Sequence, residues 1–347
     1  MSLSLTFAYP GDLGINTGGY GYDRRVVAGL QTLGWSVTLL PLGDGFPAPS
    51  QTVLDTADAR LSALADNTLV LVDGLAYGVL DGWASDHATR LRIAALVHHP
   101  LALETGISRD ERLRVAASER KALSFARHVF VTSPMTGREL VENYAVSPTA
   151  LTVALPGTEP SGLSPRKNEP PVIISVGTLT RRKGHDVLIR ALKQVETLPW
   201  TARIVGSRTL DTATASALDA LIASLDLAER IKLVGEVEDS RAEMMRADIF
   251  ALASRYEGYG MVFAEALSHG LPIVACATGA VPEVVPENAG MLVPVDNVEA
   301  FAGALRQMLT EATTRKAKAR GSAAAGGRLP TWNDTAAILS RRLQELT

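Results

Sequence analysis

The fold of this chain is decided by the stretch Ser254-Arg-Tyr-Glu-Gly-Tyr-Gly-Met-Val-Phe-Ala-Glu-Ala-Leu-Ser-His-Gly-Leu-Pro-Ile-Val274. An apolar strand is expected just before it, at residues 249–253, and a helix from about Met261 to His269–Gly270, because glycine and a following proline end helices. The order is therefore strand, glycine-rich turn and helix. In that order, free backbone N–H groups and the positive end of the helix dipole point at the space above the turn, which favours a phosphate there.

Two carboxylates in this stretch, Glu257 and Glu265, lie eight residues apart. Glu257 falls in the turn and Glu265 about one turn into the helix, where a carboxylate can accept hydrogen bonds from sugar hydroxyls. The alternative interpretation is an ordinary strand-to-helix turn with two solvated glutamates. The Gly-x-Gly pattern of Gly258 and Gly260 is by itself a weak signal, and the full stretch is much more specific.

The composition is that of a globular protein, with 46% hydrophobic and 20% charged residues among 347. This length exceeds what one core supports, so two domains are expected. The net charge of −3 implies no strong attraction to nucleic acid. The single cysteine, Cys276, excludes an internal disulfide framework and suits a reducing cytosol. Residues 3–8 are apolar without a basic leader, and no apolar run approaches ~18 residues, so we expect neither a signal peptide nor a membrane span.

Short apolar runs alternate with helical patterns along the whole chain, which predicts an α/β fold with parallel sheets. The runs that predict strands are residues 3–8, 36–42, 69–72, 93–97, 129–132 and 151–154, and then 172–176, 202–206, 231–234, 249–253, 273–277 and 290–294. A proline-rich segment at 160–171 separates the two halves and is interpreted as a linker.

In the first half, Gly18-Gly19-Tyr20-Gly21 opens a helix after the first strand. This is either a tight turn or a backbone cradle for a ligand phosphate or sugar. It is not a dinucleotide fingerprint, because no third glycine follows at the required spacing.

Two histidines, His98 and His99, directly follow the strand at 93–97. Ligands bind at strand ends in open α/β sheets, so both are candidates. A metal pair is disfavoured because adjacent residues of an extended chain point in opposite directions and because no third ligand is evident. A packed structural histidine is the alternative.

In the second half, the loop Gly177-Thr-Leu-Thr-Arg-Arg-Lys-Gly184 carries three basic residues between glycines. Lysine as a point charge and arginine as a fork suit a diphosphate, although exposed loop charges are the alternative. The helix that Ser108 and Glu111 open as a capping box is rich in charge; a solvated face is favoured over a surface for an anionic acceptor or lipid headgroup.

The full stretch from Ser254 to Val274 resembles the Glu-x7-Glu motif of the family-4 retaining glycosyltransferases of the GT-B fold. The resemblance implies two Rossmann-like doubly wound domains that face each other across a cleft, with the C-terminal helix crossing back to the N-terminal domain. It implies an acceptor-side domain of residues 1–160 plus 331–347 and a nucleotide-sugar donor domain of residues 161–330.

The resemblance also implies site residues. Catalytic roles fall to His98 (with His99 as the fallback), Glu257 and Lys183. The donor-binding positions are Gly18, Gly19, Arg182, Gly235, Val237, Gly258, Tyr259, Gly260, Met261, Val262 and Glu265. Thr178 stands where the family has a phosphate-binding arginine, so that contact is in doubt and Arg181 or Arg182 is the candidate to replace it.

By this resemblance the protein is a cytoplasmic, metal-independent, retaining hexosyltransferase of polysaccharide biosynthesis, with a UDP- or GDP-linked donor and a glycan, glycolipid or polysaccharide acceptor. No cofactor and no metal site are expected, since no two aspartates have the Asp-x-Asp spacing. A peripheral contact with the cytoplasmic face of a membrane stays open. The alternatives are a nucleotide-sugar epimerase, a phosphorylase, or a donor-binding protein that has lost transfer; a hydride-transfer enzyme is more distant.

Overall fold

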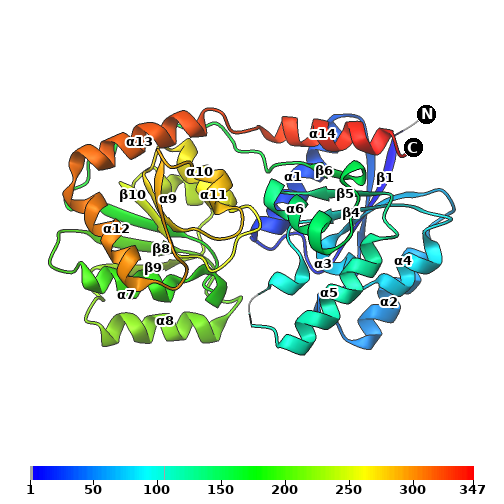
Figure 1. Cartoon of the computed structure of the whole chain (residues 1–347), viewed down its shortest axis with the longest axis horizontal. Coiled ribbons are helices and arrows are strands. Elements are labelled where there is room, and N and C mark those ends of the chain that lie inside the picture. The colour runs from blue at the N-terminus through cyan, green and yellow to red at the C-terminus, as the bar shows by residue number, and fades with distance from the viewer. Residues whose placement is uncertain (1–2, 105) are drawn as a thin grey trace. The chain divides into compact units, whose positions relative to one another are not determined.

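The computed structural model describes residues 3–104 and 106–347. Contacts divide the chain into two compact units, Met1–Gly157 with Pro330–Thr347, and Thr158–Leu329. Each is an open, parallel α/β sheet covered by helices (Figure 1). The predicted α/β class is confirmed, and each unit is described below by itself.

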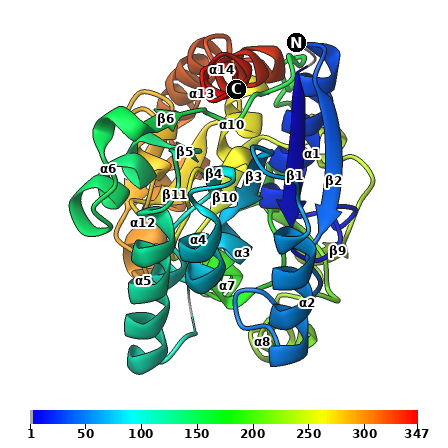
Figure 2. The same ribbon diagram turned by 90° about the vertical axis from the view of Figure 1, so that its right-hand side faces the viewer.

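The first unit contains a six-stranded sheet in the order β2-β1-β3-β4-β5-β6, and Figure 2 shows β1 and β2 side by side at its edge. Every pair in it is parallel. Its strands are β1 (Ser4–Tyr9), β2 (Ser36–Pro41), β3 (Leu69–Asp73), β4 (Arg92–Val97), β5 (His128–Val131) and β6 (Leu151–Val153). Its helices are α1 (Gly18–Thr32), α2 (Gln51–Ser62), α3 (Gly74–Tyr77), α4 (Asp81–His87), α5 (Arg109–Leu123), α6 (Pro134–Asn143) and α14 (Trp332–Gln344), with 3-10 turns at Leu101–Leu103 and Pro148–Ala150.

The second unit contains a six-stranded parallel sheet in the order β12-β11-β10-β7-β8-β9. Its strands are β7 (Val172–Val176), β8 (Thr201–Val205), β9 (Ile231–Gly235), β10 (Ile249–Leu252), β11 (Ile273–Cys276) and β12 (Gly290–Val293). Its helices are α7 (His185–Gln194), α8 (Thr212–Ser224), α9 (Ser240–Met244), α10 (Met261–Ser268), α11 (Val281–Val284), α12 (Val298–Thr310) and α13 (Ala312–Gly326), with a 3-10 turn at Arg181–Lys183.

The central strands are continuous apolar runs because helices cover both faces of each sheet. All residues of β3, β10 and β11 are buried. The twelve apolar runs that predict strands all form strands, with ends that differ by a residue or two. The sequence of the polar helix α2 has no clear apolar stripe that would predict a helix, because this helix buries only Ala57 and Leu61.

The proline-rich segment that was interpreted as a linker packs on the second unit. Ser164 donates to the Ala247 carbonyl at 2.6 Å, and Asn168 donates to Asp248 at 2.8 Å.

The C-terminal helix α14 belongs to the first unit and packs along α1, as the resemblance implied. A Cβ on Gly29 of α1 would lie 2.5 Å from the Cβ of Ala336, so glycine allows the two helices to approach. The indole of Trp35 donates to Ser340 at 2.9 Å, and the hydroxyl of Thr335 donates to the Leu155 carbonyl at 2.7 Å. The last residues of the chain therefore complete the core of its first half.

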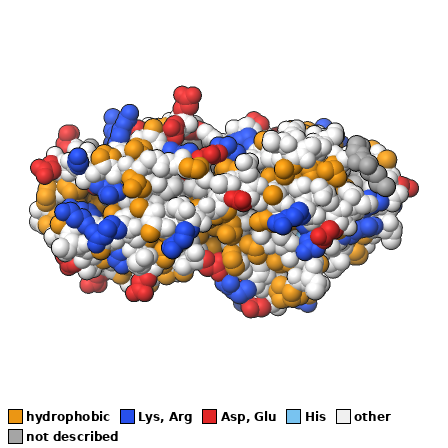
Figure 3. Space-filling model, turned by 90° about the horizontal axis from the view of Figure 1, so that it is seen from above, with side chains coloured by type: hydrophobic (Ala, Val, Ile, Leu, Met, Phe, Trp, Pro, Cys, Tyr) orange, Lys and Arg blue, Asp and Glu red, His pale blue; other side chains and the backbone are white. Residues whose placement is uncertain are grey.

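Figure 3 shows lysine and arginine interspersed with aspartate and glutamate on one face of the molecule. This agrees with a net charge of −3. Among the described residues, no helix combines the length and the apolar character needed to cross a membrane.

Glu119 of α5 is a buried carboxyl group with a consequence for stability. One oxygen accepts the Leu101 N–H at 2.9 Å, and the other has no hydrogen-bond partner among the residues described. Burial raises the pKa of Glu119 to about 8. The Glu119 carboxyl group therefore keeps its proton in the folded chain at pH values where it has lost it in the unfolded chain, whose glutamates have the ordinary pKa of about 4.3.

We expect the free energy of unfolding to fall by roughly 2–4 kcal/mol as the pH rises from 5 to 9, because the folded state binds the extra proton across that window. Urea unfolding at several pH values measures it. Glu119→Gln keeps the acceptor for Leu101 and removes the charge, so its curve should be flatter. Glu142→Gln, at an exposed position of α6, should leave the slope unchanged. Equal slopes for wild type and Glu119→Gln would contradict the prediction.

Candidate active site

The turn between β10 and α10 has the predicted strand–turn–helix geometry. α10 begins at Met261, after Gly260 with φ = 90°, a conformation that favours glycine. A Cβ on Gly260 would lie 2.6 Å from the Phe263 ring. No side chain of the described chain caps this end of the helix. The first N–H groups, at Met261 and Val262, are therefore not used within the helix, and free N–H groups at a helix start are where proteins commonly bind anions.

The Glu257 side chain lies at the centre of a buried ionic cluster. Its Oε1 accepts from the Lys183 ammonium at 2.6 Å and from the Ser254 hydroxyl at 2.7 Å, and its Oε2 accepts from the Arg182 guanidinium at 3.3 Å. Only 4% of Glu257 and 8% of Lys183 are exposed. The structure thus brings together three predicted site residues, Arg182, Lys183 and Glu257.

The charged groups in this cluster shift each other's pKa values. Burial alone would raise the pKa of Glu257, but Lys183 and Arg182 overcome it and lower the pKa to about 2. Burial lowers the pKa of Lys183, and Glu257 opposes that shift. The cluster holds two cations and one anion, so its net charge favours an additional negative group.

The loop after β7 supplies both basic residues, and glycines allow it to lie against the β10 loop. Gly184 has φ = 64°, and a Cβ there would lie 1.9 Å from the Ala253 carbonyl oxygen. Arg182, not Arg181, reaches Glu257 and the Tyr256 carbonyl, which it meets at 3.0 Å. Arg181 is exposed. Arg182 is therefore the candidate to fill the place left by Thr178.

Two residues of the opening stretch, Ser254 and Arg255, were not predicted as site residues. Arg255 ties the two loops together: its N–H donates to the Arg182 carbonyl at 2.8 Å, and its guanidinium binds Asp186 at 3.0 Å and Asp296 at 2.8 Å. Their places next to Glu257 in the sequence were the available signal. Ser254 contacts Glu257 only three residues away. The partners of Arg255 are far away in the chain, and local reasoning does not reach them.

Glu265 lies one turn into α10 and is half-buried. Burial raises its pKa to about 7, and Arg241 acts in the opposite direction. Near neutral pH its carboxyl group is therefore close to half-ionised. The neighbouring Tyr259 is buried between Gly258 and Gly260, and burial raises its pKa to about 12, so its phenol stays protonated.

The end of β9 lies beside the loop after β7. Gly235, with φ = 86°, accepts the Gly206 N–H at 2.9 Å, and a Cβ on Gly206 would lie 1.8 Å from the Gly177 carbonyl oxygen. Val237 follows in the half-buried turn after Gly235. Because β10, β7, β8 and β9 are neighbours, their carboxyl ends gather these loops at one edge of the sheet, where open α/β sheets bind ligands.

In the first unit, His98 follows β4, and its Nε2 lies 3.1 Å from Asp23 Oδ1 and 3.3 Å from Asp73 Oδ2. Asp73 ends β3 and also caps α3 by accepting the Leu75 N–H at 2.8 Å. Asp23 is fully buried in α1. Its Oδ2 has no hydrogen-bond partner in the described part of the chain.

These three groups correct one step of the sequence reasoning, which found no third ligand near the histidines. Within the described residues, Asp23, Asp73 and His98 are a set that could hold a metal ion, with ligand atoms all within 4.8 Å of one another. The signals were present, since Asp73 and His98 both follow apolar strands. Only the sheet order places those strand ends side by side.

The carboxylates of Asp23 and Asp73 favour the protonated form of the His98 imidazole. Burial would lower the pKa of His98, but Asp23 and Asp73 raise it to about 10, so the ring is a cation at neutral pH. Burial raises the pKa of Asp23 to about 7. A Cβ on Gly19 would lie 3.7 Å from the His98 ring, so the Gly18-Gly19 start of α1 is next to it. His99 pairs instead with Glu104 at 2.5 Å and does not join the cluster.

Part of the chain that carries this geometry is similar to a known protein family. Residues 161–325 match the model of the "Glycosyl transferases group 1" family. A D-inositol 3-phosphate glycosyltransferase of Kineococcus radiotolerans is 28% identical over 231 residues, which are 57% of this chain and 53% of that protein. A GDP-mannose-dependent monoacylated alpha-(1-6)-phosphatidylinositol monomannoside mannosyltransferase of Corynebacterium glutamicum is 33% identical over 158 residues, 42% of this chain and 40% of that protein. The chain thus spans about half the length of the curated relatives it matches.

Solved structures share the fold over nearly the whole chain. Sucrose-phosphate synthase from Thermosynechococcus elongatus has a TM-score of 0.82 at 19% identity and covers 98% of each chain. Anabaena HepE in complex with UDP and glucose has a TM-score of 0.76 at 17% identity, covering 98% of this chain and 99% of that one. The chain therefore has the GT-B fold, and its residues 161–325 are similar to the glycosyl transferases group 1 family.

Proposed function

We propose that this protein is a retaining, metal-independent glycosyltransferase that moves a hexosyl unit from a nucleotide sugar to a glycan, glycolipid or polysaccharide acceptor. The observation that carries the proposal is the buried cluster of Lys183, Arg182 and Glu257 on two loops of a glycosyl transferases group 1 domain. A nucleoside diphosphate is the leaving group of such a reaction. Preorganised cations are the groups that stabilise the charge developing on it.

The predicted residues with side chains or backbone groups that can contact the donor have these roles under the proposal. Lys183, Arg182 and the N–H groups at the start of α10 bind the diphosphate, Glu265 accepts from the ribose hydroxyls, and the turn at Gly235 and Val237 receives the base. Glu257 holds Lys183 and Arg182 in place, and it orients the sugar by accepting hydrogen bonds from the hydroxyl groups of the sugar. His98, held as a cation by two aspartates, is suited to donate a hydrogen bond and unsuited to act as a base.

The donor and acceptor classes are proposed on the names of similar proteins. One relative is named as GDP-mannose-dependent, and one structural neighbour was solved with UDP and glucose. The relative from Corynebacterium acts, by its name, on a phosphatidylinositol monomannoside. These names support a UDP- or GDP-linked donor and a glycolipid or glycan acceptor, and with a glycolipid, a peripheral contact with a membrane.

The experiment that tests the proposal is a calorimetric titration of the full chain with UDP, GDP and ADP in the presence of a metal chelator. One nucleotide should bind well, and its sugar conjugates should then be turned over with release of the nucleoside diphosphate. Binding of none of the three, even after Mg²⁺ or Mn²⁺ is added, would overturn the transferase proposal. Saturable binding of the donor with neither transfer nor slow hydrolysis would indicate a binding protein, and conversion of the sugar without an acceptor an epimerase.

The half-ionised state of Glu265 predicts a pH dependence of donor binding. The carboxylate accepts two hydrogen bonds from a vicinal diol, whereas the protonated group accepts fewer, so binding should tighten as the pH rises through the pKa of about 7. Between pH 6 and 8 we expect a gain of roughly three- to tenfold. A nucleotide sugar is the probe, because its phosphates do not titrate there. Glu265→Gln should remove this gain, and an unchanged gain in that variant would refute the assignment.

A further inference from the structure

Arg255 lies in the turn between β10 and α10, two residues before Glu257. Its backbone and side chain contact three other loops, each of which follows a strand of the same sheet. We propose that Arg255 is a positioning residue for the diphosphate of the donor, because it fixes the loop after β7 relative to the start of α10. The inference rests on the proposed function and deepens the account of the same site.

The contacts with the loop after β7 are the first observation. The Arg255 N–H donates to the Arg182 carbonyl at 2.8 Å, and its guanidinium donates to the Arg181 carbonyl. The guanidinium also binds both carboxylate oxygens of Asp186, at the start of α7, at 3.0 Å each. These acceptors lie before and after Lys183 in the chain, so the segment that carries the two basic site residues is held at both ends.

The contacts with the loops after β11 and β12 are the second observation. The Arg255 guanidinium donates to Asp296, after β12, at 2.8 Å, and the hydroxyl of Thr278, after β11, donates to the Arg255 carbonyl at 2.8 Å. Because β12, β11, β10 and β7 are consecutive in the sheet, one residue links the carboxyl ends of four neighbouring strands. Only 17% of the Arg255 side chain is exposed, so its ion pairs are less screened by water than surface pairs are.

Glu257 is the other tie between the loops after β7 and β10, because its carboxylate binds Lys183 and Arg182. A diphosphate competes with this carboxylate for the same two cations, so donor binding would weaken that tie. Arg255 uses its guanidinium on two carboxylates and a backbone carbonyl, and an anionic ligand cannot replace a donor to those acceptors. The contacts of Arg255 therefore persist when the donor is bound.

The consequence concerns the second phosphate of the nucleotide. Under the proposed function, Lys183 and Arg182 on one loop and the first N–H groups of α10 on the other bind the same diphosphate. A ligand that bridges two loops binds more tightly when the loops are fixed in advance, because less entropy is lost on binding. A monophosphate can bind to one loop alone and gains less from a fixed spacing. The ratio of the dissociation constants of a nucleoside monophosphate and its diphosphate therefore reports the role of Arg255.

The test is a calorimetric titration of the full chain with UDP, UMP, GDP and GMP. In the wild type, the diphosphate of the preferred base should bind at least roughly tenfold more tightly than its monophosphate. Arg255→Met keeps an apolar stem of similar length and removes the guanidinium, so it should lower this ratio at least roughly threefold. Arg255→Lys keeps the charge but has one ammonium group for three acceptor groups, and its ratio should lie between the other two.

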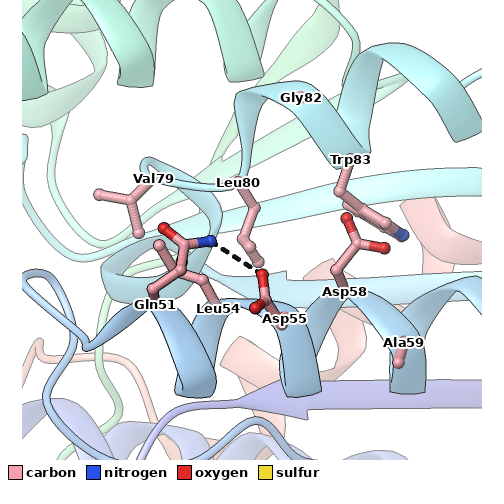
Figure 4. Close-up of a pocket in the computed structure, with 9 residues that line it drawn as sticks. All are labelled: Gln51, Leu54, Asp55, Asp58, Ala59, Val79, Leu80, Gly82 and Trp83. Atoms are coloured by element: carbon pink, nitrogen blue, oxygen red, sulfur yellow. Dashed lines mark hydrogen bonds between the residues drawn. The ribbon is translucent and has the colours of Figure 1, made fainter.

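A second nucleotide site would complicate this titration, and a pocket around Trp83 in the first unit has the size for a small molecule. Figure 4 shows this pocket between α2 and α4, with a volume of about 390 Å³. Its lining residues, all within the described part of the chain, include Asp55 and Asp58 and no lysine or arginine. Two carboxylates repel a diphosphate, so we expect one nucleotide to bind per chain.

Arg190→Met is the matched control, because Arg190 also pairs with Asp186, at 2.9 Å, but lies within α7 rather than in either loop. It removes one positive charge, as Arg255→Met does, and should keep the wild-type ratio. Urea unfolding shows which variants are folded, and Arg255→Lys keeps the test decisive if Arg255→Met folds poorly.

Three results would overturn the proposal. The first is a wild-type ratio in every folded variant of Arg255, and the second is a loss of affinity by the same factor for the monophosphate and the diphosphate. The third is an equal fall of the ratio in Arg190→Met. If the wild type binds none of the nucleotides, the proposed function fails as well. If the wild type prefers the diphosphate and the Arg255 variants keep its ratio, only the role of Arg255 is refuted.

Discussion

Glu257→Ala should lower the turnover of the donor at least roughly a hundredfold, because the sugar loses its orienting carboxylate and the basic pair loses its anchor. In the structure this carboxylate holds Lys183 at 2.6 Å and Arg182 at 3.3 Å. Release of the nucleoside diphosphate from the nucleotide sugar measures the effect. Turnover at a tenth or more of the wild-type value would refute the orienting role.

Nucleotide binding separates this role from a structural one. Glu257 occupies the two cations that a diphosphate would use, so its removal should leave the affinity for the free nucleoside diphosphate unchanged or increase it. Loss of one partner of a buried ion pair costs roughly 3–5 kcal/mol of stability, so the unfolding curve must be measured in parallel. Glu236→Ala, at an exposed position after β9, is the control. A variant that is folded but has lost nucleotide binding would show that Glu257 only shapes the loops.

Gly184→Ala should destabilise the protein by roughly 2–4 kcal/mol, because the residue has a left-handed backbone and its new Cβ would overlap the β10 loop. The φ angle is 64°, and the Cβ would lie 1.9 Å from the Ala253 carbonyl oxygen. Relief of that overlap separates the loop that carries Lys183 from the loop that carries Glu257. Nucleotide affinity should therefore fall together with stability.

The matched control is Gly303→Ala, in the interior of α12, where a Cβ would have no atom of the described chain within 4 Å. Alanine there should stabilise the helix by roughly 0.5–1 kcal/mol, since glycine is a poor helix former. If the local geometry decides the outcome, urea unfolding should show a lower free energy of unfolding for Gly184→Ala than for the wild type and a higher one for Gly303→Ala. A Gly184→Ala protein as stable as the wild type would show that the two loops are not closely packed in solution.

Each of the two units contains a cluster in which cationic side chains contact carboxylates. Lys183 and Arg182 carry positive charge in the second unit, and His98 is held as a cation between two carboxylates in the first. They differ in balance: the first cluster has one anion for two cations, and the second has two acids for one imidazole. Only the cluster of Lys183, Arg182 and Glu257 has an excess of positive charge, which a diphosphate would neutralise.

The sequence by itself determined the local elements and the loops that carry chemistry. Continuous apolar runs such as residues 69–72 and 249–253 predict strands buried on both faces, and the structure has β3 and β10 there. His98 was a candidate because strand ends of a parallel sheet are where ligands bind, whereas the roles of Lys183 and Glu257 were implied by the resemblance of their motifs to a known family. These inferences use only neighbours along the chain.

The tertiary structure decided which of these residues meet. Lys183 and Glu257 are 74 positions apart, and they touch because β7 and β10 are adjacent in the sheet. Asp23, Asp73 and His98 form a cluster because α1 packs where β3 and β4 run side by side. Strand order is a long-range property that depends on how the whole apolar core is buried, whereas hydrophobic pattern and turn signals are local. For that reason the sequence identified the groups, and only the folded chain showed their partners, their shifted pKa values and the pocket around Trp83.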